Sequence, residues 1–81
     1  MTKGDDLVVD WFRLLVQLKD VGYTSYAVSH FTGIPKSTLM SYKQGTQPSH
    51  QHGERLLKFW GEAIGAPVAT APRISRFSHK A

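Results

Sequence analysis

Two glycines, Gly33 and Gly45, divide the middle of this 81-residue chain into short segments and constrain its fold more than any other feature. Hydroxyl side chains that make good helix N-caps precede the first segment, so we predict a helix from residue 24 or 25 to residue 32. Gly33 ends that helix because a residue without a Cβ adopts a left-handed turn at least cost. Pro35 is suited to a helix start, so a second helix is predicted over residues 35–44.

Apolar residues recur at helical spacing before and after these two segments. The first stripe predicts a helix over residues 6–20, capped by Asp5 or Asp6. The second stripe predicts a helix over residues 50–64, with Ser49 as a candidate cap. The apolar residues of the four helices that we expect to face the core are Leu7, Val8, Trp11, Leu14, Leu15, Leu18, Val28, Phe31, Leu39, Tyr42, Leu56, Leu57, Trp60 and Ile64.

Residues 66–81 show no helical period and are rich in Pro, Ser, Ala and basic side chains. Such a composition predicts a basic C-terminal tail that is partly disordered in isolation. No strand is predicted anywhere in the chain. The fold class is therefore expected to be all-α: a compact four-helix domain over residues 1–65 with a central helix-turn-helix, followed by the tail over residues 66–81.

The composition argues against several classes of function. The chain has no cysteine, which excludes a disulfide scaffold, a thiol nucleophile and cysteine-ligated zinc. The spacing of its four histidines suits no metal site, and no Ser/His/Asp arrangement is present, so we expect no enzyme, no cofactor and no small-molecule substrate. Its apolar runs are too short to span a membrane and its first residues are not typical of a signal peptide, so we expect a cytoplasmic protein without a membrane partner.

The charge of the chain favours a polyanionic partner. Its formal net charge is +4, and residues 24–53 contain Lys36 and Lys43 but no acidic residue. A carboxylate in that stretch would repel phosphate. The acid-free stretch covers the whole predicted helix-turn-helix, which is the motif that presents its second helix to the DNA major groove.

A set of apolar, small and turn residues recurs at fixed spacing within residues 28–45: Val28, Ser29, Phe31, Gly33, Ile34, Pro35, Ser37, Thr38, Leu39, Tyr42 and Gly45. This spacing resembles the helix-turn-helix of the lambda-repressor-like (Cro/repressor) superfamily. Ser29 stands where that family usually has alanine, and Ser25 stands where it often has a glutamine that contacts DNA. The resemblance implies a four-helix DNA-binding fold and a regulator of the kind found in phages and mobile elements.

In such a fold the exposed face of the second helix enters the major groove, where its side chains meet base edges. Lysine can donate to guanine, glutamine can pair with adenine, serine can pair with several bases, and methionine can contact the thymine methyl group. The residues predicted to contact bases are Lys36, Ser37, Met40, Ser41 and Gln44.

Phosphate contacts are expected at both edges of the same surface, from hydroxyl groups, amides and a lysine. The start of the first helix adds free N–H groups that suit a phosphate. The residues predicted to contact phosphates are Thr24, Ser25, Tyr26, Lys43 and Gln47.

These observations predict a sequence-specific double-stranded DNA-binding transcriptional regulator, repressor-like in action. A homodimer is expected because one small domain covers little DNA, and Val9, Phe12 and Phe59 are surplus apolar residues that could form its interface. Two alternatives stay open: a protein-binding adaptor or inhibitor that uses the same fold, and a DNA adaptor in packaging or recombination.

Overall fold

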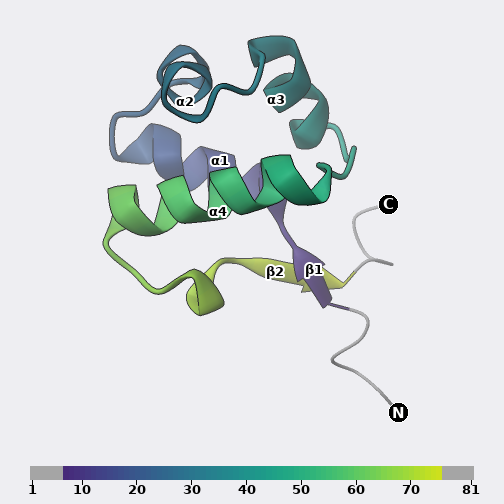
Figure 1. Ribbon diagram of the computed structural model, residues 1–81. Coiled ribbons are helices and arrows are strands. Elements are labelled where there is room, and N and C mark those ends of the chain that lie inside the picture. Colours follow the sequence, from purple (N-terminus) through teal and green to yellow (C-terminus); the bar gives the residue numbers. More distant parts are fainter. Residues whose placement is uncertain (1–6, 76–81) are drawn as a thin grey trace.

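The computed structural model describes residues 7–75 and shows four helices with one small antiparallel sheet. The α2 and α3 helices lie on one side of the molecule, α1 and α4 pack below them, and the two strands lie at the opposite end (Figure 1). The predicted fold class, a compact four-helix domain, is confirmed. The elements in chain order are β1 (Leu7–Val9), α1 (Trp11–Asp20), α2 (Ser25–Thr32), α3 (Lys36–Lys43), α4 (His50–Ile64), the 3-10 helix η2 (Val68–Thr70) and β2 (Arg73–Ser75).

The prediction that α1 starts at residue 6 is wrong. Residues 7–9 form β1, and α1 begins at Trp11 after Asp10, whose carboxylate accepts a hydrogen bond from the Arg13 amide at 3.1 Å. Asp10 is therefore the N-cap in place of Asp5 or Asp6, which lie outside the described residues. The apolar run before Asp10 fits helical spacing, but its β-branched residues suit a strand once a partner strand is available.

The partner strand is β2, in the segment predicted to be an irregular tail. Val8 pairs with Ile74 and Val9 with Arg73, and the Asp10 amide donates to the Pro72 carbonyl at 2.9 Å. The prediction of no strand is therefore wrong. Ala71, just before β2, is also buried in the core, so residues 66–75 belong to the folded unit.

The predicted turn between α2 and α3 is confirmed in detail. The Thr24 hydroxyl caps α2 by accepting from the Ala27 amide at 3.3 Å, and Gly33 follows the helix with a φ of 76°. Pro35 precedes α3 as its N-cap rather than lying inside it. Arg55 of α4 donates to the Thr32 carbonyl at 3.4 Å, which fastens the turn to the body of the domain.

The core lies where all four helices meet. Val28, Leu39 and Leu56 are almost completely buried, as predicted, and Ile34 from the turn joins them. Phe31 was expected to face inward, but 61% of its surface is exposed. The buried core residues are Trp11, Leu14, Leu15, Leu18, Val28, Ile34, Leu39, Tyr42, Leu56, Trp60 and Ala71.

The long helix α4 has the predicted bounds. The Ser49 hydroxyl accepts from the His52 amide at 3.2 Å at its start, and Gly65 ends it with a φ of 80°. Within residues 7–75, no helix combines the length and the apolar character needed to cross a membrane.

Candidate nucleic-acid interface

The α3 helix has one buried face and one face that is open to solvent. Leu39 and Tyr42 are buried against the core, whereas Ser37 and Gln44 are exposed and Met40 has 41% of its surface exposed. At about 100° per residue, these three exposed positions and the two buried ones point in opposite directions from the helix axis. The five predicted base-contact residues therefore share one side of the helix, and Ser37, Met40 and Gln44 are exposed on it.

Two of those five residues are less exposed than the others and contact other groups of the protein. Ser41 is half-buried, and its hydroxyl donates to the Thr38 carbonyl at 2.7 Å. That proton is engaged inside the helix, so Ser41 offers mainly an acceptor to a ligand. Lys36 is also half-buried, because its ammonium lies above the aromatic ring of Tyr26 with Nζ 4.0 Å from the ring centroid.

The predicted phosphate-contact residues fall at the two ends of the α2–α3 pair. Thr24, Ser25 and Tyr26 lie at the start of α2, and 71% of the Tyr26 surface is exposed. The Thr24 oxygen accepts the capping bond, which leaves its proton available to a ligand. Lys43 at the end of α3 is half-buried, and Gln47 in the following loop is exposed.

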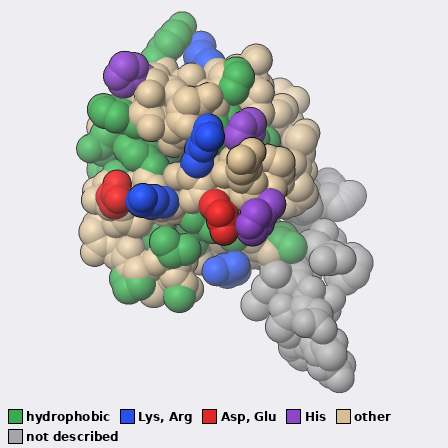
Figure 2. All heavy atoms as spheres, in the orientation of Figure 1, with side chains coloured by type: hydrophobic (Ala, Val, Ile, Leu, Met, Phe, Trp, Pro, Cys, Tyr) green, Lys and Arg blue, Asp and Glu red, His purple; other side chains and the backbone are tan. Residues whose placement is uncertain are grey.

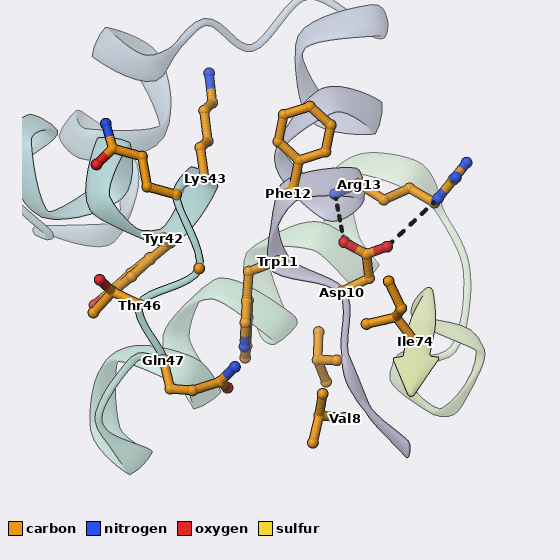
Figure 3. A pocket seen from close by; sticks show the side chains of 13 residues that line it. Val8, Asp10, Trp11, Phe12, Arg13, Tyr42, Lys43, Thr46, Gln47 and Ile74 are labelled. Atoms are coloured by element: carbon orange, nitrogen blue, oxygen red, sulfur yellow. Dashed lines mark hydrogen bonds and ion pairs between the residues drawn. The ribbon is translucent and has the colours of Figure 1, made fainter. Parts of the chain in front are cut away.

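A groove of about 470 Å³ runs beside the end of α3 and was not foreseen from the sequence. Trp11 forms part of it between α3 and the β1–β2 ribbon, and Lys43 and Phe12 extend from α3 and α1 along one side (Figure 3). The groove depends on β1 pairing with β2, since Val8 and Ile74 close its other side. Phe12, with 55% of its surface exposed, therefore borders the same region as Lys43.

Within the described residues, neither α2 nor α3 contains an acidic side chain. Among residues 7–75 the acidic side chains are those of α1, its cap and α4, and in Figure 2 the red side chains lie at the level of α4 and none lies over α2 or α3. Glu54 faces His50 at 3.1 Å, and Asp10 faces Arg13 at 3.7 Å. Within residues 7–75, α2 and α3 therefore contribute the charges of Lys36 and Lys43 without an acidic side chain of their own.

In the described part of the chain, one histidine has a buried structural partner. His52 Nδ1 lies 3.1 Å from the Tyr42 hydroxyl, which joins α4 to the buried face of α3. Burial raises the pKa of that Tyr42 hydroxyl. No group of three or more His, Cys, Asp or Glu side chains that could hold a metal ion occurs among residues 7–75.

An aromatic cluster of Tyr23, Phe31 and Phe59 lies apart from the groove, where α2 meets α4. The Phe31 ring stacks on Phe59 with centroids 5.6 Å apart, and Tyr23 meets Phe59 edge-on at 5.1 Å. Phe12 and Phe59, both suggested for a dimer interface, thus occur in different surroundings: Phe12 borders the groove, and Phe59 is half-buried in this cluster.

Comparisons of the chain with protein-family models, with curated proteins and with solved structures find no match. The resemblance of residues 28–45 to the lambda-repressor-like superfamily therefore depends on the spacing of those residues alone.

Proposed function

We propose that this protein binds double-stranded DNA sequence-specifically, with α3 in the major groove and the start of α2 against the backbone. One observation carries the proposal: the exposed face of α3 consists of side chains that can read base edges, and in the described part of the chain α2 and α3 contain no carboxylate. Ser37, Met40 and Gln44 are the most accessible of these side chains. Lys36, at the start of the helix, adds a donor for guanine.

The position of Lys36 supports an anionic partner. The first turn of a helix carries a partial positive charge, so a lysine there is electrostatically unfavourable by a few tenths of a kcal/mol up to about 1 kcal/mol. Within residues 7–75, α3 has no side-chain N-cap and no acid in its first turn to offset this effect. A cost of this kind is typical of functional sites, and a DNA phosphate or a guanine edge would relieve it.

The biological consequence that we propose is regulation of transcription by occupancy, as a repressor-like protein of a phage or mobile element. A protein bound at an operator excludes or recruits polymerase without further chemistry. Two copies on a pseudo-palindrome, about 34 Å apart, would supply the specificity that one small domain lacks. The proposal therefore includes a homodimer and a cytoplasmic location.

Selection of bound sequences from a random duplex pool tests this function. We expect enrichment of one motif with two-fold symmetry, and an affinity for it that falls steeply as salt is added. Lys58 is an exposed lysine on α4, outside the proposed surface, so Lys58→Ala is a matched control that should keep the selected sequence. Failure to enrich any motif would exclude sequence-specific binding.

The exposed ring of Phe31 favours a second candidate, a protein-binding adaptor or inhibitor. Exposed aromatic clusters are enriched in protein interfaces, and the Tyr23–Phe31–Phe59 cluster is apolar. If this function holds, duplex binding will be absent or nearly independent of salt.

A DNA adaptor in packaging or recombination needs the same α3 contacts as a regulator. Repression of a reporter gene from the selected site would separate these two roles.

A further inference from the structure

The contact between Lys36 and Tyr26 joins the first turn of α3 to the first turn of α2. The Lys36 ammonium lies 4.0 Å from the centroid of the Tyr26 ring, well within the range of a cation–π interaction. Tyr26 is 71% exposed, so its ring is not a core residue. Among the described side chains, Lys36 forms no ion pair with a carboxylate, so the aromatic ring is the group that holds its charge in place.

We propose that Tyr26 is a positioning residue, whose ring holds the Lys36 ammonium ready to donate to a base at the edge of the major groove. This inference rests on the proposed function and assigns Tyr26 a role through its ring, in place of a phosphate contact through its hydroxyl. A free lysine side chain loses rotamer freedom when it binds, whereas a lysine already held in position loses less. The ammonium has three N–H groups, so it can face the ring and still donate to a base.

The geometry separates the ring from the hydroxyl. Tyr26→Phe keeps the ring face and removes the hydroxyl, whereas Tyr26→Leu removes both. Lys36→Met keeps the aliphatic stem of the lysine and removes its charge. Because Tyr26 is exposed, neither substitution at this position should change the melting temperature of the domain by more than a few degrees.

The first measurement is made on the free protein. A proton above an aromatic ring face experiences a ring current, so the Lys36 ε-methylene protons should resonate upfield in the wild type and in Tyr26→Phe. In Tyr26→Leu they should return to the position of an ordinary lysine. The absence of an upfield shift in the wild type would overturn the inference whatever the protein binds.

The second measurement is a double-mutant cycle on the duplex that the wild type selects from a random pool, at one fixed salt concentration. Tyr26→Leu should weaken binding about two- to fivefold, Tyr26→Phe less than about twofold, and Lys36→Met roughly tenfold. In the Lys36→Met background, Tyr26→Leu should have no further effect. Tyr26→Leu should also reduce discrimination at the same base pair as Lys36→Met.

Three results of the binding cycle would also overturn the inference while leaving the proposed function intact. Equal losses from Tyr26→Phe and Tyr26→Leu would assign the effect to the hydroxyl. Equal losses from Tyr26→Leu with and without Lys36 would show that the two side chains act independently. Tighter binding by Tyr26→Leu would mean that the ring competes with DNA for the lysine. A wild type that selects no sequence would instead reject the proposed function and this inference together.

Discussion

The α3 and α4 helices are both amphipathic, but the rest of the molecule holds them in different ways. The Ser49 hydroxyl caps α4, Gly65 ends it, and Trp60 Nε1 donates to the Gln17 side chain of α1 at 3.0 Å. The α3 helix is about half as long and, in the described part of the chain, has no side-chain cap. The α3 helix packs against the core through Leu39 and Tyr42, and its opposite face is exposed to solvent. The comparison shows one helix that holds the domain together and one that presents a surface.

Substitution of Trp60 should have the largest effect on stability. Trp60 is buried in the core and also bonds to Gln17, so Trp60→Ala should lower the free energy of unfolding by about 3–5 kcal/mol. For a domain of this size that loss is a large share of the total stability. Urea denaturation followed by circular dichroism measures it, with Lys58→Ala as the exposed control on the same helix. A loss below about 1 kcal/mol would contradict the role given to α4.

Substitutions of the two half-buried lysines of α3 should change binding much more than stability. Lys36→Ala should weaken binding to the selected duplex by about 1–3 kcal/mol and relax preference at one or two base pairs. Lys43→Ala should weaken binding to all sequences alike, because we assign it a phosphate contact. Titrations against the selected duplex and a scrambled duplex distinguish the two effects. Equal loss of discrimination from both variants would contradict the assignment.

Removal of the α4 cap should have a smaller effect, and it should change stability and not binding. Ser49→Ala removes the acceptor of the His52 amide and should cost about 1 kcal/mol of stability. Its affinity for DNA should be unchanged under conditions where the domain is folded. Ser37→Ala is the matched serine substitution on α3, and it should leave the melting temperature unchanged. A larger loss of stability from Ser37→Ala than from Ser49→Ala would reverse the comparison.

The smallest effect concerns pH and the hydrogen bond between the two helices. Burial raises the pKa of Tyr42 above its ordinary value of 10.0, so the unfolded chain loses this proton at a lower pH than the folded domain. The contribution of Tyr42 to stability should therefore be complete below pH 10 and decline as the pH rises further. Tyr42→Phe should lack this part of the decline in urea denaturation between pH 8 and about 11. Identical pH profiles for the two proteins would contradict it.

The helices α2, α3 and α4 were predictable because their ends are set by local residues. Thr24, Gly33 and Ser49 act within one helical turn of their own positions, so the sequence alone indicates where they cap or end a helix. The buried face of α3 was also predictable, because Leu39 and Tyr42 are three residues apart. The exposed face of the candidate site follows from that same spacing.

The features that could not be predicted depend on contacts between distant parts of the chain. The β1 strand needs β2, which lies near the other end of the sequence, so its residues alone look like the start of a helix. Phe31 lies one turn after Val28, so its spacing predicts that it is buried with Val28. Instead its ring stacks on Phe59 of α4 at the edge of the core. The contact of Lys36 with Tyr26 depends on the path of the Gly33 turn, which no spacing rule supplies.

The central claim is that the exposed face of α3 lies in the DNA major groove. Titration of isotope-labelled protein with the selected duplex, followed by amide chemical shifts, tests it residue by residue. We predict the largest changes in residues 24–26 and 36–47, with little change in the Tyr23–Phe31–Phe59 cluster. Changes concentrated in that aromatic cluster, or the absence of changes in α3, would contradict the claim.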